Sequence, residues 1–362
     1  MKLPNIPYLI KKEIFDHLSI NQLFFFSMCS KNTKNFINVY QKHQLKKVER
    51  VTYVIRSSYK AVCFKMTNAS YNYPVMYLFK SPKDFQDFKR NDPLQVVRLN
   101  HLPTPIDMLY CLTMGPNLHA RNTLESTIKL IHSQLYDLLG NHAKYWLEIC
   151  SCGPSAGNHC VPLSHSIQKA EVFGAGFESS KIGKFLDRST SLEYFSFGSH
   201  REKPVIKLKE NSKFYNQDTV YLTVNDACFM ANDVLKGFNG RRVFLKSGDI
   251  TTPDVIQFLN EWKLGKKYKK LELISMTWNF NLQEIQNAVK IKEVDREVKY
   301  SFVTKFGGED INFPHLDSGA FESRSYMVRE SDGRVASVML TERLIMMGVW
   351  NMKEKEFLIT FN

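Results

Sequence analysis

The sequence predicts an α+β protein: a small helical N-terminal module, then a stack of alternating strands and helices flanked by antiparallel β segments. Three observations predict it. The first forty residues repeat their apolar side chains at helical intervals, the middle of the chain alternates short apolar runs with amphipathic segments, and the flanking parts alternate in twos. At 362 residues the chain is long enough for two ordinary domains, or for a small module joined to an elongated one.

The N-terminal helices are predicted by the spacing of their apolar residues. Intervals of three and four place one set of side chains on a single helical face: Ile6, Leu9, Ile10, Ile14 and Leu18. A second apolar block, from Leu23 to Met28, follows after a four-residue gap. Two short helices cannot bury so many large side chains between themselves, so some are expected to meet another surface. The alternative is an amphipathic helix packed on the chain's own next domain.

At these residues the chain resembles the F-box. The family's run of Leu-Pro, paired aliphatics, Ile-Phe, two leucines, serine and cysteine falls without a gap on Ile6-Pro7, Leu9-Ile10, Ile14-Phe15, Leu18, Leu23, Ser27 and Cys29. Ile6 replaces the usual leucine, and the aromatic residue expected near Lys31 to Thr33 is absent. The resemblance implies a three-helix hook, residues 1–40, that docks on a Skp-family linker and so joins a cullin-type ubiquitin ligase. The residues that it implies at the linker are Ile6, Pro7, Leu9, Ile10, Ile14, Phe15, Leu18, Leu23 and Phe26.

The formal net charge of +13 has two interpretations. It can attract an acidic partner, either nucleic acid or an acidic protein segment. It can also be a lysine-rich surface that serves only to prevent aggregation, and the scattered basic residues favour this second interpretation. The dense cluster lies where a helix C-terminus is predicted and where cations meet the helix dipole favourably: Lys263, Lys266, Lys267, Lys269 and Lys270.

Composition also bears on location. The seven cysteines are odd in number and irregularly spaced, which favours free thiols in a reducing compartment, the cytoplasm or the nucleus. No run approaches the roughly 18 to 20 apolar residues that a bilayer span needs, so we expect no membrane association. A signal peptide is excluded because charged residues interrupt its would-be apolar core: Lys11, Lys12, Glu13 and Asp16.

Residues 41–105 are predicted to form a connector and a β meander. Gln41 to Arg50 are polar and basic. From Val51 the period changes to two, broken at Ser57-Ser58 and at Asn68 to Asn72. The alternating residues are Val51, Tyr53, Ile55, Ala61, Cys63, Lys65, Val75, Tyr77 and Phe79.

Residues 106–296 are predicted to alternate strands with helices. The apolar runs that suit buried strands are Met108 to Leu112, Tyr145 to Ile149, Leu192 to Phe197, Val220 to Val224, Val243 to Lys246 and Leu271 to Met276. One helix is predicted from Leu124 and is closed by Gly140, another follows Thr252-Pro253 and stops at Gly265, and a third begins at Asn281. Strand, helix and strand in succession imply parallel strands with right-handed crossovers. The short, irregular unit favours a curved leucine-rich-repeat-like stack, with an ordinary two-layer α/β sandwich as the alternative.

Residues 297–362 return to alternation and are predicted to form an antiparallel β cap that hides the edge of the stack. Asp332-Gly333 fits a hairpin turn. The alternating residues are Val298, Tyr300, Phe302, Tyr326, Val328, Val335, Ser337, Met339, Met347, Val349 and Trp350.

The segment from Thr219 to Met276 resembles the F-box-associated domain of the large nematode F-box families. That family's helix with Phe-Leu-x-x-Trp, its basic glycine-containing turn and its Leu-Glu strand fall on Phe258-Leu259, Trp262, Gly265 and Leu271-Glu272. Further matches are Gly307-Gly308 with Asp310-Ile311, and Arg329 with Asp332-Gly333 and Ala336. This resemblance implies a receptor that recruits a substrate for ubiquitylation.

Catalytic and metal chemistry find little support. A zinc site would have to draw on Cys150, Cys152, His159, Cys160 and His165, but the first pair is too tight and no second pair matches it. No nucleophile elbow, metalloprotease helix or paired-carboxylate pattern is present. We therefore predict no enzyme activity, no cofactor and no metal.

Taken together, these features predict a substrate-recognition receptor of a Skp-cullin-F-box (SCF) ubiquitin ligase, which binds the Skp-family linker directly, the cullin core indirectly, and a target protein through its C-terminal region. Two other classes stay open. One is a basic nucleic-acid-binding protein, which the scattered charge makes the weaker candidate, and the other is an adaptor whose partner is not degraded.

Overall fold

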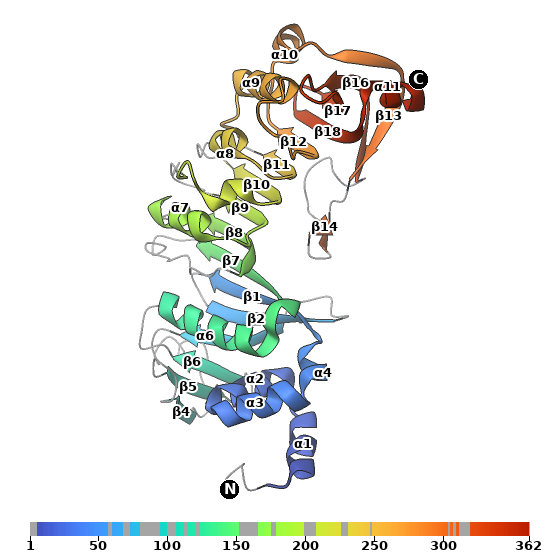
Figure 1. Ribbon diagram of the computed structural model, residues 1–362. Coiled ribbons are helices and arrows are strands. Elements are labelled where there is room, and N and C mark those ends of the chain that lie inside the picture. The colour runs from blue at the N-terminus through green and yellow to red at the C-terminus, as the bar shows by residue number, and fades with distance from the viewer. Residues whose placement is uncertain are drawn as a thin grey trace. The chain divides into compact units, whose positions relative to one another are not determined.

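The computed structural model describes residues 6–56, 60–67, 73–79, 95–99, 106–111, 115–119, 124–151, 166–174, 179–198, 208–225, 231–246, 248–302, 305–306, 309–310 and 319–361. The chain divides into two compact units, residues 1–168 and 169–362, which we call unit 1 and unit 2. The elements of each are labelled in Figure 1. The expected divisions after residues 40, 105 and 296 stay predictions.

Unit 1 begins with four helices: α1 (Tyr8–Asp16), α2 (Ile20–Cys29), α3 (Lys31–Tyr40) and α4 (Lys42–Leu45). Serines start two of them. The Ser19 side chain accepts a hydrogen bond from the backbone N–H of Gln22, whose side chain accepts one from the backbone of Ser19, and this capping box begins α2. Ser30 begins α3 by accepting from the backbone N–H of Thr33. The third helix therefore forms without the missing aromatic residue.

The sheet of unit 1 has the strand order β7-β1-β2-β3-β6-β5-β4. Its strands are β1 (Val48–Arg56), β2 (Lys60–Met66), β3 (Tyr73–Phe79), β4 (Gln95–Leu99), β5 (Ile106–Cys111), β6 (Gly115–His119) and β7 (Lys144–Ser151), and the helix α6 (Leu124–Leu139) leads into β7 through a short 3-10 turn, η2 (Gly140–His142). The predicted meander is confirmed, since β1 pairs antiparallel with β2, and β2 with β3. The predicted strand from Tyr145 is confirmed as β7, which runs parallel to β1.

The prediction that the strand from Met108 joins a parallel series was wrong. β5 pairs antiparallel with β4 and with β6. The reason is the connection, because three residues, 112–114, separate β5 from β6. A parallel crossover needs about a dozen residues, whereas a short link permits a hairpin.

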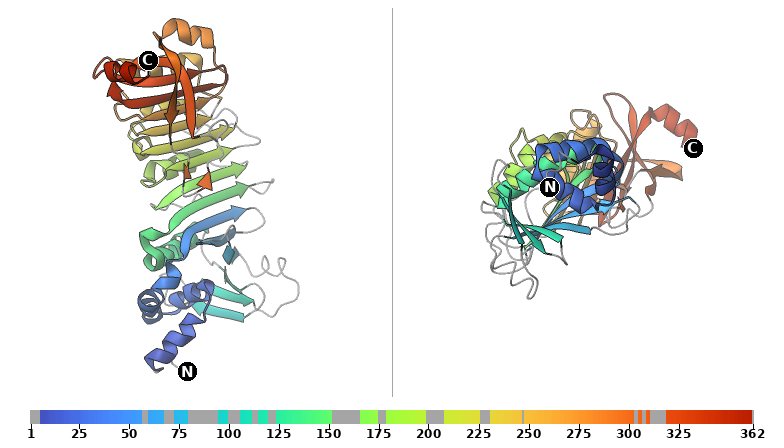
Figure 2. Two further views of the ribbon diagram at one scale, coloured as in Figure 1. Left: turned by 90° about the vertical axis from the view of Figure 1, so that its right-hand side faces the viewer. Right: turned by 90° about the horizontal axis from the view of Figure 1, so that it is seen from below.

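Unit 2 contains five parallel strands in chain order: β8 (Ile167–Gly174), β9 (Tyr194–Gly198), β10 (Thr219–Asn225), β11 (Arg242–Lys246) and β12 (Leu273–Thr277). Between them lie α7 (Ser179–Arg188), the 3-10 turn η3 (Lys213–Asn216), α8 (Ala231–Gly237) and α9 (Thr252–Lys263), and α10 (Leu282–Ala288) follows β12. Figures 1 and 2 show α7, α8 and α9 on the same face of these strands. The four predicted strands from Leu192 onward are confirmed, and β8 was not predicted.

The start of α9 differs by one residue from the prediction. Thr251, not Thr252, is the N-cap. Its side chain accepts a hydrogen bond from the backbone N–H of Asp254, and the Asp254 side chain accepts one from the backbone N–H of Thr251. Gly265 ends the helix with a φ of 69°, as predicted for a glycine stop. Asn281 caps α10 as predicted, by accepting from the backbone N–H of Glu284.

Antiparallel strands complete unit 2: β13 (Lys292–Ser301), β16 (Ala320–Val328), β17 (Arg334–Leu340) and β18 (Leu344–Lys353). β18 pairs with β12, so the predicted covering of the parallel edge is confirmed. The Asp332-Gly333 hairpin is also confirmed, with Gly333 at a φ of 74°. A two-stranded ribbon of β14 (Lys305–Phe306) and β15 (Glu309–Asp310) pairs separately.

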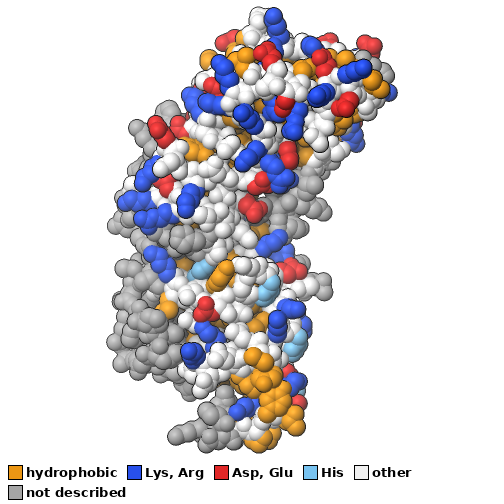
Figure 3. All heavy atoms as spheres, in the orientation of Figure 1, with side chains coloured by type: hydrophobic (Ala, Val, Ile, Leu, Met, Phe, Trp, Pro, Cys, Tyr) orange, Lys and Arg blue, Asp and Glu red, His pale blue; other side chains and the backbone are white. Residues whose placement is uncertain are grey.

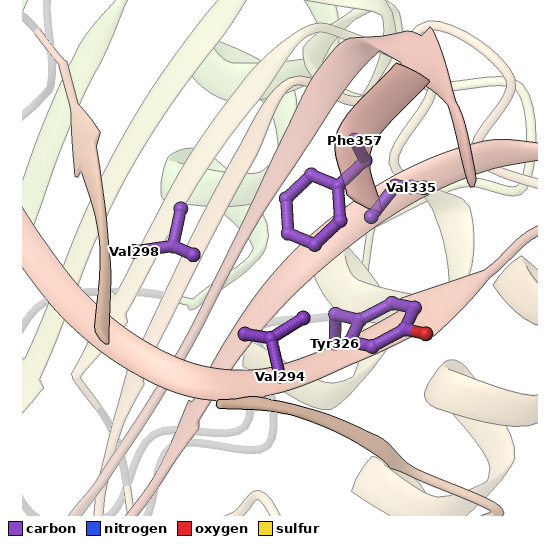
Figure 4. Close-up of a cluster of buried hydrophobic side chains, with 5 residues drawn as sticks. All are labelled: Val294, Val298, Tyr326, Val335 and Phe357. Carbon is purple, nitrogen blue, oxygen red and sulfur yellow. The ribbon is translucent and has the colours of Figure 1, made fainter. Parts of the chain in front are cut away.

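A C-terminal helix, α11 (Glu354–Phe361), was not predicted. Its buried Phe357 ring joins a cluster with residues of β13, β16 and β17, shown in Figure 4: Val294, Val298, Tyr326 and Val335. Arg296 of β13 donates to the backbone oxygens of Thr360 and Phe361 at 2.7 and 2.6 Å. The apolar cluster and these charged hydrogen bonds hold α11 against the sheet.

Candidate docking surface

The first three helices bury one set of apolar side chains and expose another. Phe15, Leu23 and Phe24 are buried, and the Phe15 ring lies 5.0 Å from that of Phe36, centroid to centroid. Phe24 reaches the sheet, with its ring 6.2 Å from that of Phe64 on β2. These residues join the helices to one another and to the domain that follows.

The exposed apolar set, which we call the docking patch, consists of Tyr8, Leu9, Ile10, Ile14, Phe26, Val39 and Tyr40. Leu9 is 74% exposed, and Ile14 and Phe26 are each 41% exposed. The Tyr8 and Tyr40 rings meet edge to face at 4.9 Å, which joins α1 to α3. Figure 3 shows hydrophobic side chains gathered over α1. Exposure of so many large apolar side chains within so short a segment makes this patch a candidate interaction surface.

Polar bonds fix the position of α1. The Gln41 side-chain amide donates to Oδ1 of Asp16 at 2.6 Å, and that of Gln44 to the Asp16 backbone oxygen at 3.3 Å. Lys12 pairs with the same carboxylate at 2.7 Å. The Lys12 hydrogen bond, followed by that from Gln41, holds the pKa of Asp16 below its usual range. These contacts tie the end of α1 to the α3–α4 turn.

The helices also bond to α6. Lys34 of α3 forms an ion pair with Asp137 at 2.8 Å and donates to the side-chain oxygen of Gln134 at 3.3 Å. His142, just beyond α6, bonds to the backbone oxygen of Leu45 at 3.2 Å. Together with Phe24 and Phe64, these bonds attach the N-terminal helices directly to the sheet domain of unit 1.

The residues expected at the linker fall into an exposed group and a buried group. Pro7, Leu9, Ile10, Ile14 and Phe26 are exposed, and Leu18 is partly buried. Ile6, Phe15 and Leu23 are buried within the chain. Three residues of the docking patch were not predicted: Tyr8, Val39 and Tyr40. Tyr8 lies beside Leu9 in the same helix, and a complete helical projection of residues 8–16 and 31–40 would have brought all three into consideration.

The decisive observation comes from comparison with protein families. Residues 3–44 match the model of the F-box domain. An F-box domain is present. No curated protein and no solved structure matches this chain. The F-box covers α1, α2 and α3 and extends into α4. Its presence suggests a substrate receptor of an SCF ubiquitin ligase and implies binding to Skp-family proteins, and F-box proteins are typically adaptors rather than enzymes.

The structure describes little of the zinc site that was weighed from the sequence. Of the residues weighed as zinc ligands, Cys150 lies on β7, and the remaining four lie outside the described residues. The described residues contain no group of three or more His, Cys, Asp or Glu side chains placed to hold a metal ion. In the described helices we find none with the length and apolar character that crossing a bilayer requires.

A polar network lies within unit 1 near its sheet. His132 of α6 bonds through Nδ1 to the Tyr53 hydroxyl at 2.7 Å and through Nε2 to the Ser166 hydroxyl at 2.5 Å. Burial lowers the pKa of His132 to about 4, so the ring is neutral near pH 7. Both ring nitrogens are engaged, and the network connects β1 and α6 to Ser166, which lies in the turn before β8.

Proposed function

We propose that this chain is the substrate-recognition receptor of an SCF ubiquitin ligase, with the docking patch bound to a Skp-family linker. The match of residues 3–44 to the F-box carries the proposal. The exposed apolar side chains of the docking patch support it, because they are available to a partner without unfolding the helices. Leu9, Ile10 and Ile14 are the proposed central contacts, and the buried Phe15 and Leu23 hold the helices in place for them.

Linker binding is tested with the full chain and a purified Skp-family protein by calorimetry. Leu9→Asp with Ile14→Asp places two charges in the patch without disturbing a buried side chain. We expect binding to weaken on the order of a hundredfold or more, since a central contact contributes about 2 kcal/mol. Ile359→Asp is the matched control, because Ile359 is an apolar side chain, 75% exposed, in unit 2. Equal affinities for the double variant and wild type would overturn the proposal.

The remainder of the chain is proposed to bind the target. The catalytic step then belongs to the ligase partners, and the receptor raises the effective concentration of the target lysine near the ubiquitin donor. The contacts of the F-box helices with α6, η2 and β2 support this role, since they attach the helices directly to the following domain. A cellular experiment distinguishes a degradation receptor from an adaptor whose target is not degraded. The Leu9→Asp, Ile14→Asp variant lengthens the half-life of a bound target only if the chain is a degradation receptor.

We also propose that the C-terminal region is an F-box-associated domain of the nematode type, with a leucine-rich-repeat-like stack. Five parallel strands in chain order support the stack. The matched residues Phe258, Leu259 and Trp262 are all buried on α9, which gives a structural reason for the family's pattern there. Circular dichroism and folding of residues 169–362 expressed alone would test whether this part is an independent domain.

The proposed location is the cytoplasm or the nucleus. Two cysteines whose side chains the structure describes, Cys29 and Cys63, are free thiols. Free thiols are typical of reducing compartments. Fluorescent tagging of the full chain tests this directly.

A further inference from the structure

A segment rich in lysine spans the last residue of α9 and the loop that follows it in unit 2. We call residues 263–270 the lysine loop, and its five lysines are Lys263, Lys266, Lys267, Lys269 and Lys270. All but Lys263 are exposed. Lys267 forms an ion pair with Glu261 at 3.1 Å. Within the described part of the chain, Lys266, Lys269 and Lys270 form no hydrogen bond or ion pair through their side chains, so their ammonium groups are available to a partner.

The backbone of the lysine loop is held in place by the hairpin between β16 and β17. Arg329 donates to the backbone oxygens of Tyr268 and Lys269, each at 3.5 Å. The backbone N–H of Glu330 donates to the oxygen of Lys263 at 2.7 Å. A loop fixed in this way presents its charges with little loss of conformational entropy on binding.

Tyr268 is the inner support of the loop. Its φ is 58°, a left-handed conformation that costs a residue with a side chain roughly 1–2 kcal/mol. Its buried hydroxyl donates to the backbone oxygen of Leu235 at 3.0 Å, and its ring packs edge to face on that of Phe258 at 4.7 Å. These contacts hold the unfavourable conformation, which directs the neighbouring lysines outward while the tyrosine points inward.

The chemistry around the loop favours a short acidic peptide over nucleic acid. Leu264, 45% exposed, lies among the lysines and offers an apolar contact. The one aromatic ring of the loop, Tyr268, is buried and cannot stack on a base. The adjoining hairpin carries two acidic residues, Glu330 and Asp332, so the basic segment is short, whereas a phosphate backbone needs a long positive track. Figure 3 shows acidic side chains interspersed with Lys and Arg on the visible face of unit 2.

We infer that the lysine loop binds an acidic peptide segment of a partner protein, with carboxylates on Lys266, Lys269 and Lys270 and an apolar side chain on Leu264. The identification of that partner as the ligase target rests on the proposed function. Peptide binding is measured without the linker, so the peptide inference and the proposed function can fail separately.

The test measures fluorescence anisotropy of a short labelled peptide in which glutamate alternates with leucine, titrated with the full chain. The variant Lys266→Glu, Lys269→Glu, Lys270→Glu is expected to weaken binding on the order of tenfold or more, because it reverses three charges at the contact. The control Lys290→Glu, Lys299→Glu, Lys355→Glu makes the same change in net charge at exposed residues of unit 2 and should bind as wild type. Replacing glutamate by glutamine in the peptide should abolish binding, and replacing leucine by serine should weaken it.

Three results would overturn the inference: no binding of the peptide by wild type, equal losses in the two triple variants, or tighter binding of a single-stranded oligonucleotide that depends on the same lysines. The last result would establish a nucleic-acid surface instead. Circular dichroism of each variant confirms that it is folded. If Lys→Glu disturbs folding, the Lys→Gln triple removes the same charges without adding repulsion and must show the same loss of peptide binding.

Discussion

Lys34 of α3 and Asp137 of α6, about a hundred residues apart in the sequence, form an ion pair of 2.8 Å. In this pair the Lys34 side chain is only 18% exposed. This contact joins an F-box helix to the helix that covers the neighbouring sheet. Because the same lysine also bonds to Gln134, its removal affects two partners on α6.

The variant Lys34→Ala should therefore loosen the F-box helices. We expect a loss of ~0.5–1 kcal/mol, typical of a partly exposed pair. Hydrogen exchange of the α3 amides in the full chain measures it, and a few-fold faster exchange is expected. Lys42→Ala is the control, since Lys42 is exposed and forms no side-chain bond within the described residues. Identical exchange in both variants would show that the ion pair contributes nothing.

Gly265→Ala should destabilise unit 2 more than Gly333→Ala. Both glycines have positive φ, 69° and 74°, so both variants carry the backbone strain of about 1 kcal/mol. At Gly265 an added Cβ would also lie 2.5 Å from the Ser331 Cβ, whereas at Gly333 the nearest atom is 3.9 Å away. We expect an additional ~1–3 kcal/mol for Gly265→Ala. Urea unfolding followed by tryptophan fluorescence compares them, and equal midpoints would contradict the steric explanation.

Arg329→Lys should be strongly destabilising although it keeps the charge. The buried Arg329 guanidinium donates to both oxygens of Asp332, at 2.9 and 2.6 Å, and also reaches two backbone oxygens of the lysine loop. A lysine ammonium cannot make this forked set of bonds, so we expect a cost of about 2–4 kcal/mol. The exposed Arg334→Lys is the control. A difference below experimental error between the two, measured by urea unfolding, would refute the prediction.

His132 should make unit 1 sensitive to mild acid. Its pKa is lowered to about 4 in the folded chain by burial, whereas an unfolded histidine titrates near 6.5. Between pH 4 and about 6.5, the unfolded state therefore binds a proton that the folded state does not. The free energy of unfolding falls as pH is lowered through this range. The loss is on the order of 2–3 kcal/mol at full protonation of the unfolded chain.

The variant His132→Gln should flatten this pH dependence. Unfolding is measured at pH 7, 6, 5 and 4, with the exposed His43→Gln as control. If the wild-type and His132→Gln profiles stay parallel, the histidine is not the source.

Local signals let the sequence predict most elements, but not how they pair or which faces they bury. The strand at β5 was recognised from its apolar run. Its direction depends on the three-residue link to β6 and on its pairing with β4, and the apolar run predicts neither. Two consecutive threonines, Thr251 and Thr252, stand at the start of α9, and Thr251 is the cap because Asp254 lies three residues after it. β8 was missed because Lys169 and Glu171 interrupt its apolar residues. α11 was missed because its apolar residues are nearly consecutive, from Phe357 to Phe361, and lack helical spacing.

The docking patch shows a similar limit. Phe15 and Phe26 both belong to the apolar pattern of the N-terminal helices, but Phe15 is buried against Phe36, whereas Phe26 is 41% exposed. Periodicity shows that a helix has an apolar face; it does not show whether the chain itself or another protein covers that face.

The pairing of β12 with β18 has a consequence for synthesis. β12 leaves the ribosome roughly 70 residues before β18, which at about 5–20 residues per second corresponds to ~4–14 s. During that interval the parallel strands that precede β12 can already pair, while the outer backbone groups of β12 have no strand beside them. The nascent chain therefore presents an open strand edge, to which a chaperone or a second nascent copy can bind, until the last part of the protein has been made.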